Sequence, residues 1–142
     1  MKQMKFFLVA LMCMMMTTVA YADDTPIPVE ALPAAAKAFV AQHFPQNKII
    51  YAEKDWRKYE AHLDNGTEVE FNRKGVWDKV DCHMTAVPAA IIPANITAYV
   101  TANFPNCIIT KIDKERHGFD VELSNDIELK FNKAGVLIGM DD

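Results

Sequence analysis

The chain has 142 residues, of which 51% are hydrophobic and 24% are charged, a composition typical of one ordinary globular unit. Its formal net charge is −4, and no run of lysine and arginine exceeds two residues. This argues against binding to nucleic acid or to an anionic membrane, because both need a basic surface.

The N-terminal segment 1–22 has the layout of a secretory signal peptide. Two lysines precede an apolar run over residues 6–19, and Ala20-Tyr21-Ala22 places small residues where a signal peptidase reads them. The run is shorter than the ~20 residues of a transmembrane helix, and Cys13 lacks the small preceding residue that lipoprotein processing needs. We therefore predict cleavage after Ala22 and a periplasmic or secreted protein without membrane attachment. Removal of the two lysines leaves 13 basic against 19 acidic residues, a net charge of −6.

The segments 28–82 and 88–142 align with each other without a gap. Identical pairs include Pro28/Pro88, Pro33/Pro93, Phe44/Phe104, Pro45/Pro105, Leu63/Leu123, Phe71/Phe131, Asn72/Asn132 and Gly75/Gly135. The pattern predicts a tandem duplication, with a signal peptide over residues 1–22, repeat one over 23–82 and repeat two over 83–142. A unit of about 55 residues buries little surface alone, so we expect the two repeats to be fused into one globular unit.

Each copy is predicted to begin with a helix. Apolar residues recur at helical spacing in both copies: Leu32, Ala36, Phe39, Val40 and Phe44, then Ile92, Ile96, Tyr99, Val100 and Phe104. Pro33 and Pro93 suit the first helical turn. Pro45 and Pro105 end the helices, because a residue before proline avoids helical backbone angles.

After the helix the period changes to two, which predicts an antiparallel meander. Tyr59, Ala61 and Leu63 alternate with polar residues, Asn65-Gly66 is a hairpin signal, and a second alternating run ends at Phe71 before another turn. The second copy repeats this pattern, and the first strand of each copy, near residues 48–55 and 108–115, does not reveal which face it buries. We predict an α+β fold in which two helix-plus-four-stranded-antiparallel-meander repeats form one sheet with the helices packed on one face.

The sequence resembles the PepSY-like, beta-lactamase-inhibitor-like family of Gram-negative periplasmic proteins. The resemblance rests on Phe44-Pro45, Phe71-Asn72 and Gly75, and on Phe104-Pro105, Phe131-Asn132 and Gly135. It implies two helices on one face of a continuous eight-stranded sheet and a concave opposite face that is free to bind another protein. Members of the family are suspected of inhibiting or regulating secreted enzymes, and some are described as calcium-regulated, although neither activity follows from the motifs.

Catalytic and metal-binding patterns are weak. Ser124 is the only serine, and the four histidines do not recur between the copies, so no triad is suggested and we predict a protein that is not an enzyme. Asp64 and Glu68 flank a turn that faintly resembles a calcium loop but lacks its spacing. We therefore predict no cofactor, with calcium at these two residues as the alternative.

The mature chain contains two cysteines in a compartment where disulfides persist. Cys82 ends the first copy and Cys107 precedes the first strand of the second. The sequence does not decide between a disulfide that joins the two copies and two separate buried thiols.

The sheet face opposite the helices is the predicted binding surface. Strand parity assigns to it Glu60, His62, Glu68, Glu70, Trp77, Lys79, Glu122, Glu128, Lys130 and Leu137, with Trp56 near a strand end. Trp77 could be an interface hot spot, or it could cover the core. We predict a periplasmic, non-enzymatic protein that engages another exported protein through this face, as an inhibitor or regulator. The alternative is a calcium- or small-ligand-responsive periplasmic sensor.

Overall fold

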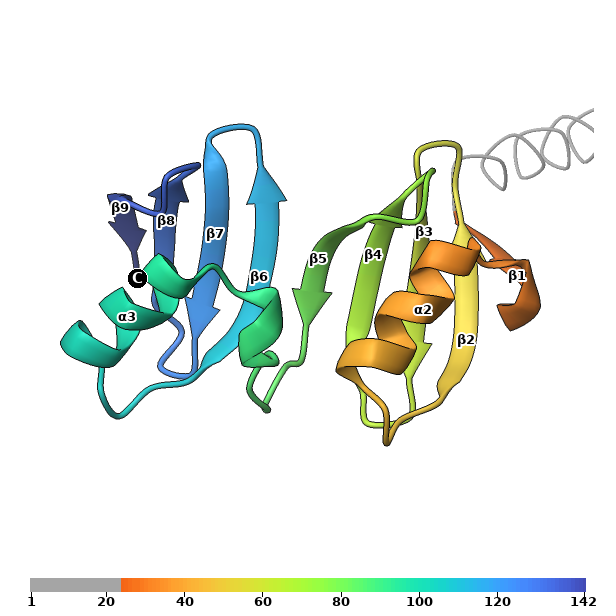
Figure 1. Cartoon of the computed structure of the whole chain (residues 1–142), viewed down its shortest axis with the longest axis horizontal. Helices are drawn as coiled ribbons and strands as arrows, with labels where there is room; N and C mark the ends of the chain where they lie inside the picture. Colours follow the sequence, from red (N-terminus) through yellow and green to blue (C-terminus); the bar gives the residue numbers. More distant parts are fainter. Residues whose placement is uncertain (1–23) are drawn as a thin grey trace, which may run out of the picture.

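A computed structural model describes residues 24–142, and the predicted signal peptide and its cleavage site lie outside this range. The described chain forms one nine-stranded antiparallel sheet whose strands follow chain order (Figure 1). The strands are β1 Thr25–Ile27, β2 Ile49–Lys54, β3 Lys58–Leu63, β4 Glu68–Asn72, β5 Trp77–Asp81, β6 Ile109–Glu115, β7 Gly118–Leu123, β8 Glu128–Asn132 and β9 Leu137–Asp141. The predicted α+β class with a single sheet is confirmed.

The helices begin and end where the prolines place them. Helix α2 spans Ala34–His43 and α3 spans Ala94–Asn103, each after a short 3₁₀ turn, η1 Val29–Ala31 or η2 Ala89–Ile91. Pro33 and Pro93 occupy the N-cap, one position before the first turn. Phe44 leaves the helical region at φ −131° and ψ 59°, just ahead of Pro45. In the described part of the chain neither helix is long and apolar enough to cross a bilayer.

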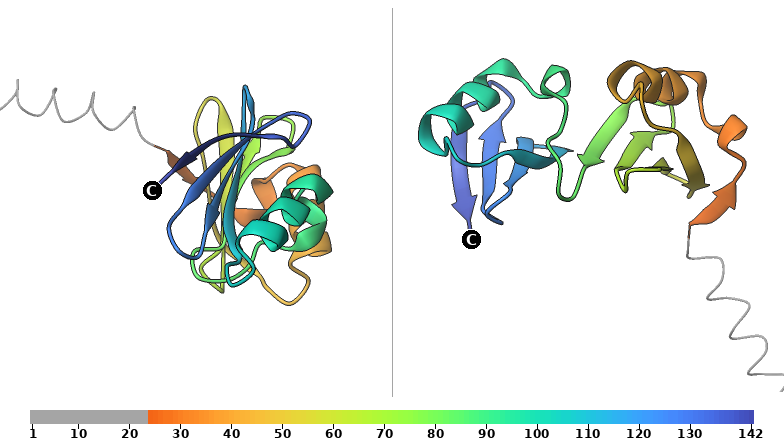
Figure 2. Two further views of the ribbon diagram at one scale, coloured as in Figure 1. Left: turned by 90° about the vertical axis from the view of Figure 1, so that its left-hand side faces the viewer. Right: turned by 90° about the horizontal axis from the view of Figure 1, so that it is seen from below.

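Both helices lie on the same side of the sheet (Figure 2). The ring of Phe39 in α2 meets Phe71 of β4 edge-on, with centroids 5.7 Å apart. Sixty residues later in the chain, Tyr99 of α3 meets Phe131 of β8 in the same way at 5.6 Å. Because each strand residue in these pairs is fully buried, the two contacts anchor the helices and mark the core face of the sheet.

The Phe-Asn-x-x-Gly motif forms the turn between β4 and β5. The Asn72 side-chain oxygen accepts hydrogen bonds from the backbone N–H groups of Lys74, at 2.9 Å, and Val76, at 3.1 Å. Gly75 has φ +84°, and a Cβ atom there would lie 2.8 Å from the Cβ of Pro33. The motif therefore closes the turn and lets it lie against the start of α2; Asn132 and Gly135 repeat the arrangement beside α3.

Strand β1 was not predicted from the sequence. It pairs with β2 at one edge of the sheet, and it has only three residues, with Pro26 inside it and Pro28 just after it. A proline has no N–H to donate, so it fits at an edge but interrupts the usual strand pattern. At the opposite edge lies β9, where Ile138 is 55% exposed and Met140 is 46% exposed.

The pairing of β5 with β6 joins residues 24–82, the first half, to residues 83–142, the second half. Its register places Lys79 opposite Asp113, and Asp81 opposite Lys111. Beside it, Cys82 is a buried free thiol and Cys107 is a half-buried one.

The disulfide that the sequence left open is therefore not formed. The backbone N–H of Cys82 donates to the carbonyl of Thr110 at 2.8 Å, and Thr110 lies three residues beyond Cys107.

Candidate functional site

The face of the sheet opposite α2 and α3, here called the free face, carries two rows of mostly charged side chains. Residues directly opposite each other on neighbouring strands share a face. The first row is Glu53, Glu60, Glu70, Lys79, Asp113, Asp120 and Lys130. The second row is Tyr51, His62, Glu68, Asp81, Lys111, Glu122, Glu128 and Asp141. Both rows cross the sheet without a break, and they include most of the residues that parity assigned to this face.

Two of the predicted surface residues, Trp77 and Leu137, face the core instead. The β4–β5 pairing shifts by one residue, so that Glu70 lies opposite Lys79 but Phe71 lies opposite Trp77. The Trp77 ring packs against Phe39 of α2, at 6.2 Å between centroids. Leu137 takes the same place opposite Phe131 after an equivalent shift. Assigning these two residues to the binding surface was wrong, because a bulge reverses the alternation of side chains.

The other tryptophan is exposed at the end of the sheet. Trp56 lies between β2 and β3, is 76% exposed, and has the Arg57 guanidinium 5.1 Å from its ring centroid. It belongs to neither row.

Sequence reasoning missed the β2 and β6 members of the rows. Tyr51 and Glu53 lie on the free face because the β2–β3 pairing shifts between Ile49 and Tyr51. The same irregularity precedes Lys111 in β6. Alternation alone could not give the face of these strands. The signal available in the sequence was Ala52, a small apolar residue between Tyr51 and Glu53, which the structure buries.

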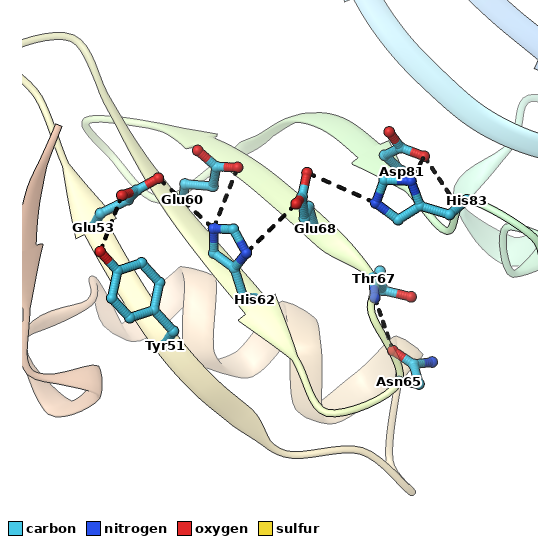
Figure 3. Close-up of polar contacts among 9 residues, drawn as sticks. All are labelled: Tyr51, Glu53, Glu60, His62, Asn65, Thr67, Glu68, Asp81 and His83. Atoms are coloured by element: carbon cyan, nitrogen blue, oxygen red, sulfur yellow. Dashed lines mark hydrogen bonds and ion pairs between the residues drawn. The ribbon is translucent and has the colours of Figure 1, made fainter. Parts of the chain in front are cut away.

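Three ionisable side chains of the first half converge on one point (Figure 3). His62 Nε2 lies 3.7 Å from Glu53 Oε1 and 3.5 Å from Glu60 Oε1. This nitrogen is buried and has no hydrogen-bond partner. The hydroxyl of Tyr51 donates to the other Glu53 oxygen at 3.2 Å. Burial, together with a hydrogen bond to the neighbouring Glu53 carboxyl, raises the pKa of Glu60 to about 7.

A second group adjoins the first through Glu68. Its Oε1 lies 3.6 Å from His62 Nδ1, and its Oε2 lies 3.8 Å from Nε2 of His83 (Figure 3). Asp81 completes the group, with Oδ1 at 3.6 Å from His83 Nδ1 and accepting the backbone N–H of His83 at 2.9 Å. This group is more open than the first, because the His83 side chain is 49% exposed.

The second half places carboxylates at the same positions but pairs them differently. Asp120 accepts a 2.6 Å contact from His117 and lies 3.7 Å from the Lys130 ammonium. Asp113 lies 3.7 Å from Lys111, and burial raises the pKa of the Asp113 carboxyl. In this half Asp113 and Asp120 therefore each lie beside a lysine or histidine of the protein itself.

The Asp64-Asn65-Gly66 turn is explained by its own hydrogen bonds. The Asn65 side-chain oxygen accepts the backbone N–H of Thr67 at 3.1 Å, and Asp64 accepts the side-chain amide of Asn47 at 2.9 Å. Glu68 belongs instead to the second row. Ser124 is likewise structural, since its hydroxyl accepts the backbone N–H of Ile108 at 3.0 Å.

The sequence matches the beta-lactamase-inhibitor-like, PepSY-like family over residues 20–68 and again over 57–139. The chain belongs to this family. Comparison with curated proteins gives no match.

Three solved structures of Bacteroides proteins are similar to this chain over most of their length. A periplasmic protein of Bacteroides thetaiotaomicron, whose name proposes calcium regulation, is 42% identical; the match covers 85% of this chain and 98% of that one, with a TM-score of 0.79. A periplasmic protein of the DUF2874 family from Bacteroides vulgatus is 40% identical over 84% and 98% of the two chains, with a TM-score of 0.77. A Bacteroides vulgatus periplasmic protein of unknown function is 34% identical over 84% and 100%, with a TM-score of 0.79.

Proposed function

We propose that this PepSY-like chain is an exported, non-enzymatic binding protein that engages another exported protein through the free face. The observation that carries the proposal is the pair of charged rows, the first from β2 to β8 and the second from β2 to β9, on a face that neither helix covers (Figure 2). The periplasmic relatives support the location. The matching positions of helices, strands and turns in the two copies support a tandem duplication that doubles this surface.

The charges of the free face indicate the chemistry of the partner. Acids outnumber lysines in both rows, and several acids lie directly opposite each other, such as Glu60 opposite Glu70 and Glu122 opposite Glu128. Like charges in such positions destabilise a sheet, and a basic partner surface would relieve that repulsion. We infer a partner that presents lysine or arginine, with charge complementarity acting mainly on specificity and association rate. Inhibition or regulation of an enzyme is one form that this binding would take.

Charge reversal tests the proposal. Periplasmic extract of the native host is passed over four immobilised proteins. They are the parent, the single variants Glu68→Lys and Glu128→Lys, and the control variant Glu30→Lys. Glu30 is an exposed acid in η1, away from the free face, so its variant has the same change in net charge. A partner that binds the parent and the Glu30 variant but not the free-face variants supports the proposal. Equal retention by all four proteins would show that the free face is only a solvated surface.

A second candidate function is a calcium response. It is favoured by the name of the 42% identical relative and by the carboxylates on and beside the free face, including Asp64 and Glu68. Thermal unfolding in calcium chloride, with magnesium chloride at equal ionic strength as the control, tests it. Calcium binding at the turn would raise the melting temperature of the parent but not that of Asp64→Asn.

A further inference from the structure

We propose that Glu53, Glu60 and His62 form a binding site for a divalent transition cation of the zinc class. The site lies on the free face of the first half and is built from the adjacent strands β2 and β3 (Figure 3). The proposal does not depend on a protein partner and goes beyond the functions proposed above.

The geometry of the three ligand atoms is the first argument. The distances from His62 Nε2 to the two glutamate oxygens, 3.5 and 3.7 Å, are too long for good hydrogen bonds. They are close to the ~3.4 Å edge of a tetrahedron whose centre lies ~2.1 Å from each ligand, the usual arrangement around zinc. All three ligand atoms lie within 4.8 Å of one another, so small movements of the glutamate side chains would let one cation contact all three.

The state of the imidazole is the second argument. Nε2 of His62 is buried and has no hydrogen-bond partner in the structure, although a buried polar atom is normally satisfied. Its other ring nitrogen faces Glu68 at 3.6 Å. A metal-bound histidine usually directs its second N–H at a carboxylate, which fixes the ring and increases its basicity. Glu68 has the place of such a positioning residue.

The histidine also determines which cations suit the site. Imidazole is a ligand for zinc, copper, nickel and iron, whereas calcium and magnesium take oxygen ligands. Three protein ligands leave a fourth coordination position for water or for a group of a partner.

The second half supplies an internal comparison. Asp113, Asp120 and Glu122 occupy the positions equivalent to Glu53, Glu60 and His62. There Lys111, Lys130 and His117 pair with the acids. In the first half Lys58 pairs with Glu70, and within residues 24–142 no lysine or arginine forms an ion pair with Glu53 or Glu60. Two carboxylates without a lysine or arginine partner thus lie beside a histidine in the first half, whereas the equivalent Asp113 and Asp120 of the second half are each paired with a lysine.

The experiment is calorimetric titration of the purified full chain with zinc chloride. We expect one zinc ion per chain with a Kd on the order of 1 µM or tighter, and binding weaker by roughly tenfold or more in His62→Gln and in Glu60→Gln. The matched control is Glu122→Gln, at the position equivalent to His62, which should bind zinc like the parent. Cobalt chloride gives a second readout, because a four-coordinate site with a nitrogen ligand produces visible absorption bands that His62→Gln should lose.

Three results would overturn the proposal. They are absence of zinc binding by the parent, undiminished binding by His62→Gln, and loss of binding in His83→Gln alone, which would assign the metal to Glu68, Asp81 and His83. Displacement of the bound zinc by millimolar calcium would contradict the inferred selectivity for a cation of the zinc class over calcium. Circular dichroism in EDTA verifies that each variant is folded, and Glu53→Gln replaces any variant that is not.

Discussion

Replacement of Trp77 by alanine tests the corrected position of this residue. If Trp77 were exposed on the free face, its removal would weaken partner binding and leave stability unchanged. Its ring instead contacts Phe39 at 6.2 Å and has the Lys114 ammonium 4.1 Å from its centroid. The variant should therefore unfold more easily while the charged rows stay intact.

The magnitude follows from these contacts. A fully buried aromatic residue replaced by alanine costs about 3–5 kcal/mol. Trp77 is half-buried, so about half of this value applies, and the Lys114 contact adds roughly 0.5–1 kcal/mol. We expect the free energy of unfolding of Trp77→Ala to fall by about 2–3.5 kcal/mol.

Urea denaturation followed by far-ultraviolet circular dichroism measures this loss without depending on tryptophan fluorescence. Trp56→Ala is the matched control, because its side chain is 76% exposed and its removal should change stability by less than about 0.5 kcal/mol. Equal denaturation midpoints for the two variants would refute the reasoning and return Trp77 to the list of surface residues.

Three other predictions concern a turn, a carboxyl group and the thiols. Gly75→Ala should destabilise the protein by at least about 1 kcal/mol more than Gly66→Ala, because both glycines have positive φ but only a Cβ at Gly75 would meet Pro33; equal melting temperatures would contradict the close approach. In EDTA, the stability that Glu60 contributes should be fully present below pH about 4.5 and lost as pH rises through about 7, because the folded state holds the Glu60 proton more tightly than the unfolded state. The Glu60→Gln variant should have a flatter profile of stability against pH. A profile like that of the parent would show that the pKa of Glu60 is not raised. Titration of unreduced, denatured protein lacking residues 1–22 should find two reactive thiols, whereas none would indicate a disulfide.

The parts of the fold that depend on local chemistry could be predicted from the sequence. Prolines bound both helices, and asparagine and glycine mark the Asn-x-x-Gly turns. The burial of Val69 and Phe71 follows from the alternation of apolar and polar residues within one strand. The bulges could not be predicted, because no residue near Tyr51 or Asp78 distinguishes a shifted register from a regular one. Each bulge moves the residues beyond it to the other face of the sheet. A prediction from regular alternation therefore placed Trp77 on the wrong face and left Glu53 unassigned.

The candidate metal ligands depend on pairing between strands rather than on spacing within one. Glu53 and Glu60 lie directly opposite each other. His62 follows Glu60 on the same face of β3, and both approach Glu53 only because β2 and β3 pair in this register. The spacing of the three residues along the chain matches no common metal-binding motif. Alternation could therefore assign Glu60 and His62 to a face but could not bring all three ligands together.

The way in which β5 joins β6 gives the sheet a direction of growth. Strand β9 pairs with β8 as β5 pairs with β4, with the same shift in register, so its outer edge resembles the edge of β5 that pairs with β6. The β1 edge is different, because Pro26 has no N–H to donate to a further strand. A third helix-and-meander unit appended by design after β9 would meet an edge of the kind already used once, whereas the same unit placed ahead of β1 would not. A proline within β1 thus limits pairing at that edge of the sheet, whereas β9 contains no proline.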